Sequence, residues 1–116
     1  MEIIHRRLNR ADVLALNGRL DAATAPLLKQ HLDTLFAQRR YRIVLDLAGL
    51  EHMSSPGLHV LAEARKRAHD GTLAGIEGGD IRIANLSPRM KGVFDLVGFT
   101  SLFRIYPDVV EAVGSF

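Results

Sequence analysis

Two adjacent serines, followed by Pro56 and Gly57, are the residues of this chain best suited to chemistry; they lie in the stretch HMSSPGLHVLAEARKR, residues 52–67. Proline fixes its own φ near a helical value, lacks an N–H and pushes the preceding residue towards an extended conformation. The sequence therefore predicts a helix whose first residue is Pro56 and whose N-cap is Ser55.

The position of Ser55 is compatible with two roles. The first is structural, with the hydroxyl serving only as a helix cap. The second is chemical, because unpaired N–H groups and the helix dipole favour negative charge at the start of a helix. A phosphate there would add about −1.5 to −2 charges and three acceptor oxygens, and would act on any partner that touches this surface.

Asp46, an acidic residue at the end of an apolar stretch, is a second candidate for chemistry. A phospho-acceptor aspartate of the receiver type would need an acidic pair to hold Mg²⁺, and the N-terminal segments lack one. We expect Asp46 to be structural and to hold the following loop through hydrogen bonds to backbone amides.

Sites of other kinds are not indicated, and we expect no catalytic activity, no metal and no cofactor. The sequence SSPGL is not a G-x-S-x-G elbow, and the glycines of residues 71–80 form neither a dinucleotide-binding motif nor a P-loop. The histidines lack a metal-ligand spacing, so we expect them to be surface or partly buried residues. They are His5, His31, His52, His59 and His69.

Composition points to a cytoplasmic protein that does not bind nucleic acid. The chain of 116 residues has no cysteine, and its 15 basic and 13 acidic residues nearly cancel. Aromatic residues for base stacking are few. No apolar run approaches the roughly 18 residues of a membrane span, and the N-terminus does not resemble a signal peptide. The composition indicates no particular oligomeric state.

The elements that must position these residues alternate between strand and helix patterns. Apolar spacing and turn residues predict strands over 2–8, 12–18, 41–47, 81–85 and 102–105, and helices over 22–38, 56–69, 87–97 and 107–113. Asp21 or Thr24 would cap the first helix. In the third, Ser87 is the expected cap, Met90, Val93, Phe94 and Val97 the inward face, and Gly98 the C-terminal left-handed residue.

This order predicts one α/β domain over residues 1–116. The sheet should be mixed and mainly parallel, with an N-terminal hairpin strand and about four covering helices. The glycine-rich residues 71–80 should form a flexible loop. The serines would then follow the carboxyl end of a strand, where functional groups of such sheets gather.

Four segments of the sequence resemble one known family. They are LNGRLDAATAPLL at 16–28, IVLDLAGLEHMSSPGL at 43–58, IRIANLSPRMKGVFDLVGF at 81–99 and the EAV near the C-terminus. The family is the STAS domain, and the chain looks most like the small bacterial anti-sigma factor antagonists, also called anti-anti-sigma factors. The resemblance implies the STAS fold.

The resemblance also implies a function, a switch and a set of partners. Ser55 takes the slot of the phosphorylated serine, with Ser54 as the alternative acceptor. The phosphate would come from an anti-sigma factor with serine-kinase activity, and a serine phosphatase would remove it. Without phosphate the protein would hold the anti-sigma factor, and with phosphate it would release it. The implied contact residues are Asp21, Ser54, Ser55, Pro56, Gly57 and Leu58.

Two alternatives remain open at this point. One is an unphosphorylated STAS adaptor or scaffold in a transport or signalling complex, in which Ser55 only caps the helix. The other is a nucleotide-binding STAS module. The sequence departs from the family pattern at Ser54, which replaces an aspartate, and at Pro56, which replaces a small residue and deletes an amide.

Overall fold

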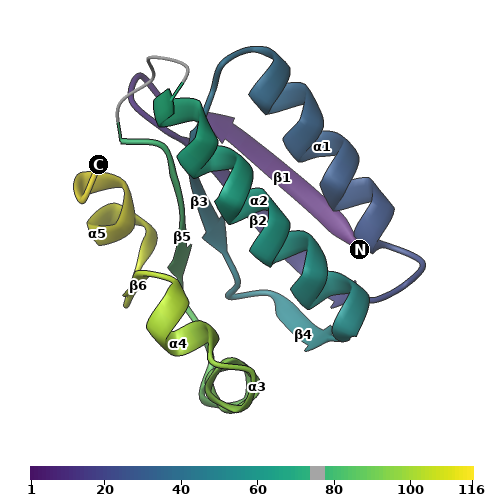
Figure 1. The fold of residues 1–116 in the computed structure, drawn as a ribbon. Helices are drawn as coiled ribbons and strands as arrows, with labels where there is room; N and C mark the ends of the chain where they lie inside the picture. Colours follow the sequence, from purple (N-terminus) through teal and green to yellow (C-terminus); the bar gives the residue numbers. More distant parts are fainter. Residues whose placement is uncertain (74–77) are drawn as a thin grey trace.

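The fold is a sheet of six strands with helices on both faces, seen in a computed structural model that describes residues 1–73 and 78–116, the side chains of 72 and 73 excepted (Figure 1). The strands are β1 (Glu2–Arg7), β2 (Asp12–Leu20), β3 (Arg42–Asp46), β4 (Leu50–Met53), β5 (Asp80–Ala84) and β6 (Ile105–Tyr106). The helices are α1 (Ala25–Ala37), α2 (Ser55–Leu73), α3 (Pro88–Leu96), α4 (Phe99–Leu102) and α5 (Val109–Gly114).

The sheet has the order β1-β2-β3-β5-β6, with β4 paired to β2. β1 and β2 are antiparallel, and every other pair is parallel. The long strand β2 pairs with β3 through its first residues and with β4 through its last, with an irregularity between Gly18 and Arg19. The predicted mixed, mainly parallel sheet with an N-terminal hairpin is confirmed.

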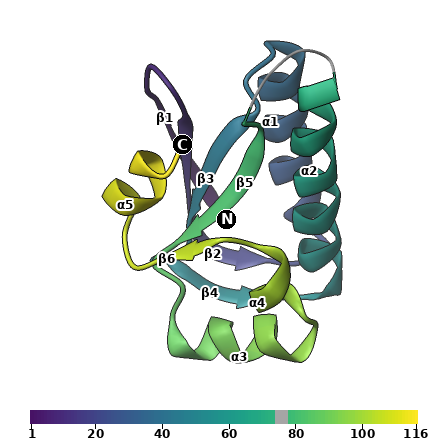
Figure 2. The ribbon, with the colours of Figure 1, turned by 60° about the vertical axis from the view of Figure 1, so that its left-hand side comes forward.

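Two apolar layers hold the helices on the sheet. α1 and α2 cover one face and bury the larger cluster, which includes Leu28, Leu32 and Leu61 (Figure 2). α5 covers the other face over a smaller cluster around Val44 and Ala112. α3 and α4 lie at the end of the sheet where β4 and the start of α2 are found.

The strongest sequence signals predicted α3 well. Ser87 caps it by accepting a hydrogen bond from the Met90 N–H at 3.2 Å, and Gly98 follows with a φ of +81°. Phe94 is fully buried, but Val97 is 44% exposed, so the expectation that Val97 faces the core is wrong. The helix ends at Leu96, and Val97 already belongs to its C-cap.

Several predicted boundaries are wrong. α2 continues to Leu73 instead of ending at 69, because Gly71 lets the helix lie against Tyr41, where an added Cβ would be 2.7 Å from the ring. Of the predicted loop 71–80, residues 74–77 lie outside the described residues.

The short strand β4 was missed. The strand predicted over 102–105 begins later, because Leu102 ends α4 and β6 covers Ile105–Tyr106. The last helix begins only after Asp108, which caps it.

The contrast between Phe94 and Val97 yields a stability prediction. Phe94→Ala should lower the free energy of unfolding by about 3–5 kcal/mol, because it opens a cavity under α3. Val97→Ala, on the exposed end of the same segment, should change it by less than about 0.5 kcal/mol. Urea unfolding of both variants measures the difference, and equal losses would contradict the burial described here.

Candidate functional site

The start of α2 lies directly against the end of β2. In the pairing of β2 with β4, Leu20 lies beside Met53, the last residue of β4. The next residue, Ser54, donates its N–H to the Leu20 carbonyl at 2.9 Å, and its hydroxyl lies 3.5 Å from the same oxygen. The chain therefore turns from strand to helix while attached to the neighbouring strand.

The helix begins one residue earlier than predicted. The Leu58 N–H donates to the Ser54 carbonyl at 3.0 Å, so Ser54 occupies the N-cap position and Ser55 is the first helical residue. The expectation that Ser55 is the N-cap is wrong. Proline is accepted throughout the first helical turn, where N–H groups lack intrahelical partners, and so Pro56 did not determine the starting residue.

Ser55 and Pro56 are both exposed. In the part of the chain that the structure describes, the Ser55 hydroxyl has no hydrogen-bond partner. Gly57 is buried against Leu20, where an added Cβ would lie 2.7 Å from Cγ and 3.0 Å from the carbonyl oxygen. Leu58 is half-buried and packs on the core. The first turn of α2 thus packs closely against β2 and exposes the Ser55 hydroxyl.

Asp21 lies in the loop that follows β2 and precedes α1. Its Oδ1 accepts hydrogen bonds from the N–H groups of Ala23 at 3.0 Å and Thr24 at 3.2 Å. Burial raises the pKa of this carboxyl. The two backbone hydrogen bonds, the Thr24 hydroxyl and Arg19 together lower the pKa by more than burial raises it, so the net shift is downward. Asp21 therefore fixes the loop beside the site as a carboxylate.

Asp46 joins two loops at the same end of the sheet. The Ala48 N–H donates to its Oδ1 at 3.1 Å, in line with the expected bond to a following amide. The Asn85 side chain, at the end of β5, donates to the same oxygen at 3.0 Å. Asp46 is thus engaged on both sides by protein groups.

A small groove between α1 and α2 extends the face that begins at Ser55. It has a volume of about 200 Å³, with Leu32, Phe36 and Val60 among its apolar lining and His59 and Glu63 among its polar lining. His59 and Glu63 follow Ser55 at successive steps of four residues, which places them on one side of the helix. The sequence reasoning missed this groove, although that spacing could have indicated the polar side.

Asp33 of α1 holds the two helices that form the groove together. It accepts hydrogen bonds from Arg67 of α2 and from Lys29 of its own helix. The hydrogen bond from Arg67 is the largest of several contributions that lower the pKa of Asp33, and Arg67 also lies over the Phe36 ring at 4.7 Å. The Asp33–Arg67 pair therefore bridges the two helices beside the groove.

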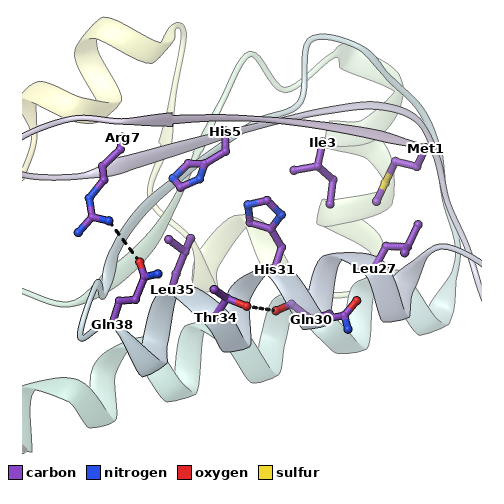
Figure 3. A pocket seen from close by; sticks show the side chains of 10 residues that line it. All are labelled: Met1, Ile3, His5, Arg7, Leu27, Gln30, His31, Thr34, Leu35 and Gln38. Carbon is purple, nitrogen blue, oxygen red and sulfur yellow. Dashed lines mark hydrogen bonds between the residues drawn. The ribbon is translucent and has the colours of Figure 1, made fainter.

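The histidines are distributed over the molecule. His5 and His69 each lie beside a buried aspartate, Asp12 at 2.8 Å and Asp80 at 2.9 Å. His5 also faces His31 across the space between β1 and α1 (Figure 3). Within the searched residues, no three histidine, aspartate or glutamate side chains gather as ligands of a metal ion would.

The comparison with known families identifies the chain's relatives. The sequence profile of the STAS domain matches residues 3–112. The chain belongs to the STAS domain family. In the described residues of this STAS domain, none of the helices has the length and apolar character needed to cross a membrane.

Two named sequence relatives match most of this STAS domain. BtrV of Bordetella bronchiseptica, whose name describes it as a candidate anti-sigma factor antagonist, is 27% identical over 116 residues, covering 100% of this chain and 95% of BtrV. RsfB of Mycobacterium tuberculosis, named an anti-sigma-F factor antagonist, is 25% identical over 105 residues, covering 90% of this chain and 80% of RsfB.

Solved structures share the fold. An anti-sigma factor antagonist from Mycobacterium paratuberculosis superposes with a TM-score of 0.84 at 22% identity, covering 98% of this chain and 92% of that one. SpoIIAA of Bacillus in its phosphorylated form gives 0.72 at 21% identity, with 98% of both chains covered.

The hydrogen bonds of Asp21 predict how this STAS domain responds to acid. Because the folded-state pKa lies below the ordinary 3.8, the carboxylate stabilises the fold fully above that value and loses this contribution as pH falls through the lowered pKa. Asp21→Asn should therefore be less stable than the wild type at neutral pH, and the gap should shrink in acid. Urea midpoints across the pH range measure this, and a gap that is constant or grows in acid would contradict it.

Proposed function

We propose that this STAS domain is an anti-sigma factor antagonist. It would bind an anti-sigma factor through the first turn of α2 and the loop at Asp21, and release it when Ser55 carries a phosphate. The observation that carries the proposal is the exposed, unpartnered hydroxyl at the first residue of α2. The names of BtrV and RsfB support the same function.

A phosphorylation switch is supported by what is known of one structural neighbour. SpoIIAA has been solved both in an unphosphorylated and in a phosphorylated form. The family resemblance assigns the acceptor position in this chain to Ser55, with Ser54 as the alternative. Ser54 is half-buried and lies against the Leu20 carbonyl, whereas Ser55 is exposed. This difference in access favours Ser55 as the acceptor.

The size of the electrostatic effect is sufficient for a switch. A hundredfold loss of affinity corresponds to about 2.7 kcal/mol, and a like-charge juxtaposition at an interface costs several kcal/mol. A phosphate at the first residue of a 19-residue helix is compatible with the fold, because the helix start favours negative charge. The phosphate would therefore act on the partner and leave the architecture unchanged.

The partner would contact the whole face that starts at Ser55. His59 is exposed over 79% of its side chain, and the neighbouring groove offers an apolar floor between α1 and α2. Apolar contacts in such a groove would supply affinity, and a phosphate on Ser55, one helical turn before His59, would weaken the complex. We propose further that the protein is one cytoplasmic domain over residues 1–116 and acts by binding, while a kinase-active anti-sigma factor and a serine phosphatase perform the chemistry.

The central experiment follows the phosphate and the affinity together. The wild type is incubated with ATP and each histidine-kinase-like ATPase domain of the source genome, the modified residue is mapped by mass spectrometry, and binding is measured by calorimetry. We expect phosphate on Ser55. Ser55→Asp should weaken binding at least tenfold, about 1.4 kcal/mol, and Ser55→Ala should bind as the wild type does.

Ser54→Ala is the matched control, because it removes the adjacent hydroxyl and leaves Ser55 in place. It should still be phosphorylated on Ser55. Phosphate found on Ser54 would refute the assignment to Ser55. Phosphate on neither serine, with tight binding by Ser55→Asp, would refute the switch and favour an adaptor role.

A further inference from the structure

A second hollow lies at the open edge of β5, away from Ser55. β6 pairs only with Ile83 and Ala84, so the first half of β5 has no strand neighbour on that side within the described residues. The hollow has a volume of about 390 Å³, within the usual range for small-molecule sites. Its charged and hydroxyl-bearing lining consists of Arg65, His69, Asp80, Arg82, Ser101 and Arg104. We call it the arginine cleft.

Asp80, the acidic residue among that lining, is already engaged. Its Oδ1 accepts from the Ile81 N–H at 2.9 Å and lies 2.9 Å from the His69 Nε2, and its Oδ2 accepts from Arg82 Nε at 3.1 Å. Arg82 also donates to the Ser115 hydroxyl at 2.6 Å. Asp80 and Arg82 therefore neutralise each other, and the charge of the other two arginines is left over.

Arg65 has the least satisfied side chain in the cleft. Its Nε is buried and has no hydrogen-bond partner, the single such side-chain atom among the described residues. The structure gives its guanidinium no ion pair either, in that same part of the chain. A buried donor without an acceptor is unfavourable, so a bound oxygen ligand that draws the guanidinium into a new arrangement would be stabilising.

Arg104 and Ser101 complete the set of available donors. Arg104 is exposed, and its guanidinium has no ion pair in the described part of the chain. Ser101 is exposed, and its hydroxyl has no partner among the described residues. Two guanidinium groups and a hydroxyl facing one hollow match the oxygens of a phosphate or carboxylate, which arginine binds in bidentate fashion.

We propose that the arginine cleft binds a small molecule through a phosphate or carboxylate group. This site is separate from the face at Ser55, because Arg65 lies ten residues further along α2, about 15 Å at 1.5 Å per residue. The proposal therefore stands or falls independently of the phosphorylation switch.

The test uses three anions on the full chain: inorganic phosphate, pyrophosphate and citrate. Calorimetry gives the affinity, and backbone NMR shifts show where each anion binds. We expect shifts at the cleft residues with at least one of these anions. Preference for pyrophosphate would identify a phosphorylated ligand, and preference for citrate a carboxylate.

Matched variants separate the cleft from general charge attraction. Arg65→Gln and Arg104→Gln should each raise Kd at least tenfold. Lys66→Gln removes the same charge from the next, exposed position of α2 and should leave Kd within about twofold. Arg104 is exposed, so its variant keeps the test valid if Arg65→Gln unfolds. Absence of binding up to about 10 mM of all three anions, or equal weakening by Lys66→Gln, would overturn the proposal.

Discussion

The attachment of the first turn of α2 to Leu20 is the constraint on which the candidate site depends. One backbone hydrogen bond joins Ser54 to the Leu20 carbonyl, and Gly57 fits against the Leu20 side chain only because it has no Cβ. A hydrogen bond of this kind is worth about 1 kcal/mol, but the close approach adds a steric requirement that no larger residue meets without movement. Together they fix the position of the first turn of α2, and with it Ser55, relative to the sheet.

Hydrogen bonds also hold the surroundings of the serine. The loop at Asp21 is fixed by backbone donors to a carboxylate, and the loop after Asp46 is fixed in the same way. α1 and α2 are joined by the Asp33–Arg67 pair across their shared groove. An exposed ion pair contributes at most about 1 kcal/mol to stability, so its larger effect is to orient the helices. The surface around Ser55 is therefore held by several contacts within the fold.

The sequence predicted those parts of the fold whose signals are local. Ser87, Pro88 and Gly98 mark the ends of the α3 segment through local interactions, and the structure agrees. β4 was not predicted because its four residues show no clear alternation of apolar and polar side chains. Its strand character comes from pairing with β2 beyond the end of β3. The extension of α2 was not predicted because glycine usually ends helices, whereas Gly71 lies inside the helix and its missing Cβ leaves room for Tyr41, thirty residues away.

The same distinction applies to the candidate sites. The serine pair could be singled out because proline and glycine next to it act on the adjacent backbone. The groove and the arginine cleft could not, because each is lined by residues from segments far apart in the chain, such as Phe36 with Arg67 and Arg65 with Arg104. Only the topology brings these residues together.

Pro56 bears on how a phosphate at Ser55 would be received. The N–H of Ser54 is taken by Leu20, Pro56 has none, and the N–H of Leu58 belongs to the helix. The first turn thus retains only the amides of Ser55 and the buried Gly57 for an anion. A phosphate with so few backbone donors would stay hydrated and project outward. Its charge would then be felt mainly by the surface of the partner, which is what a switch of binding without a change of fold requires.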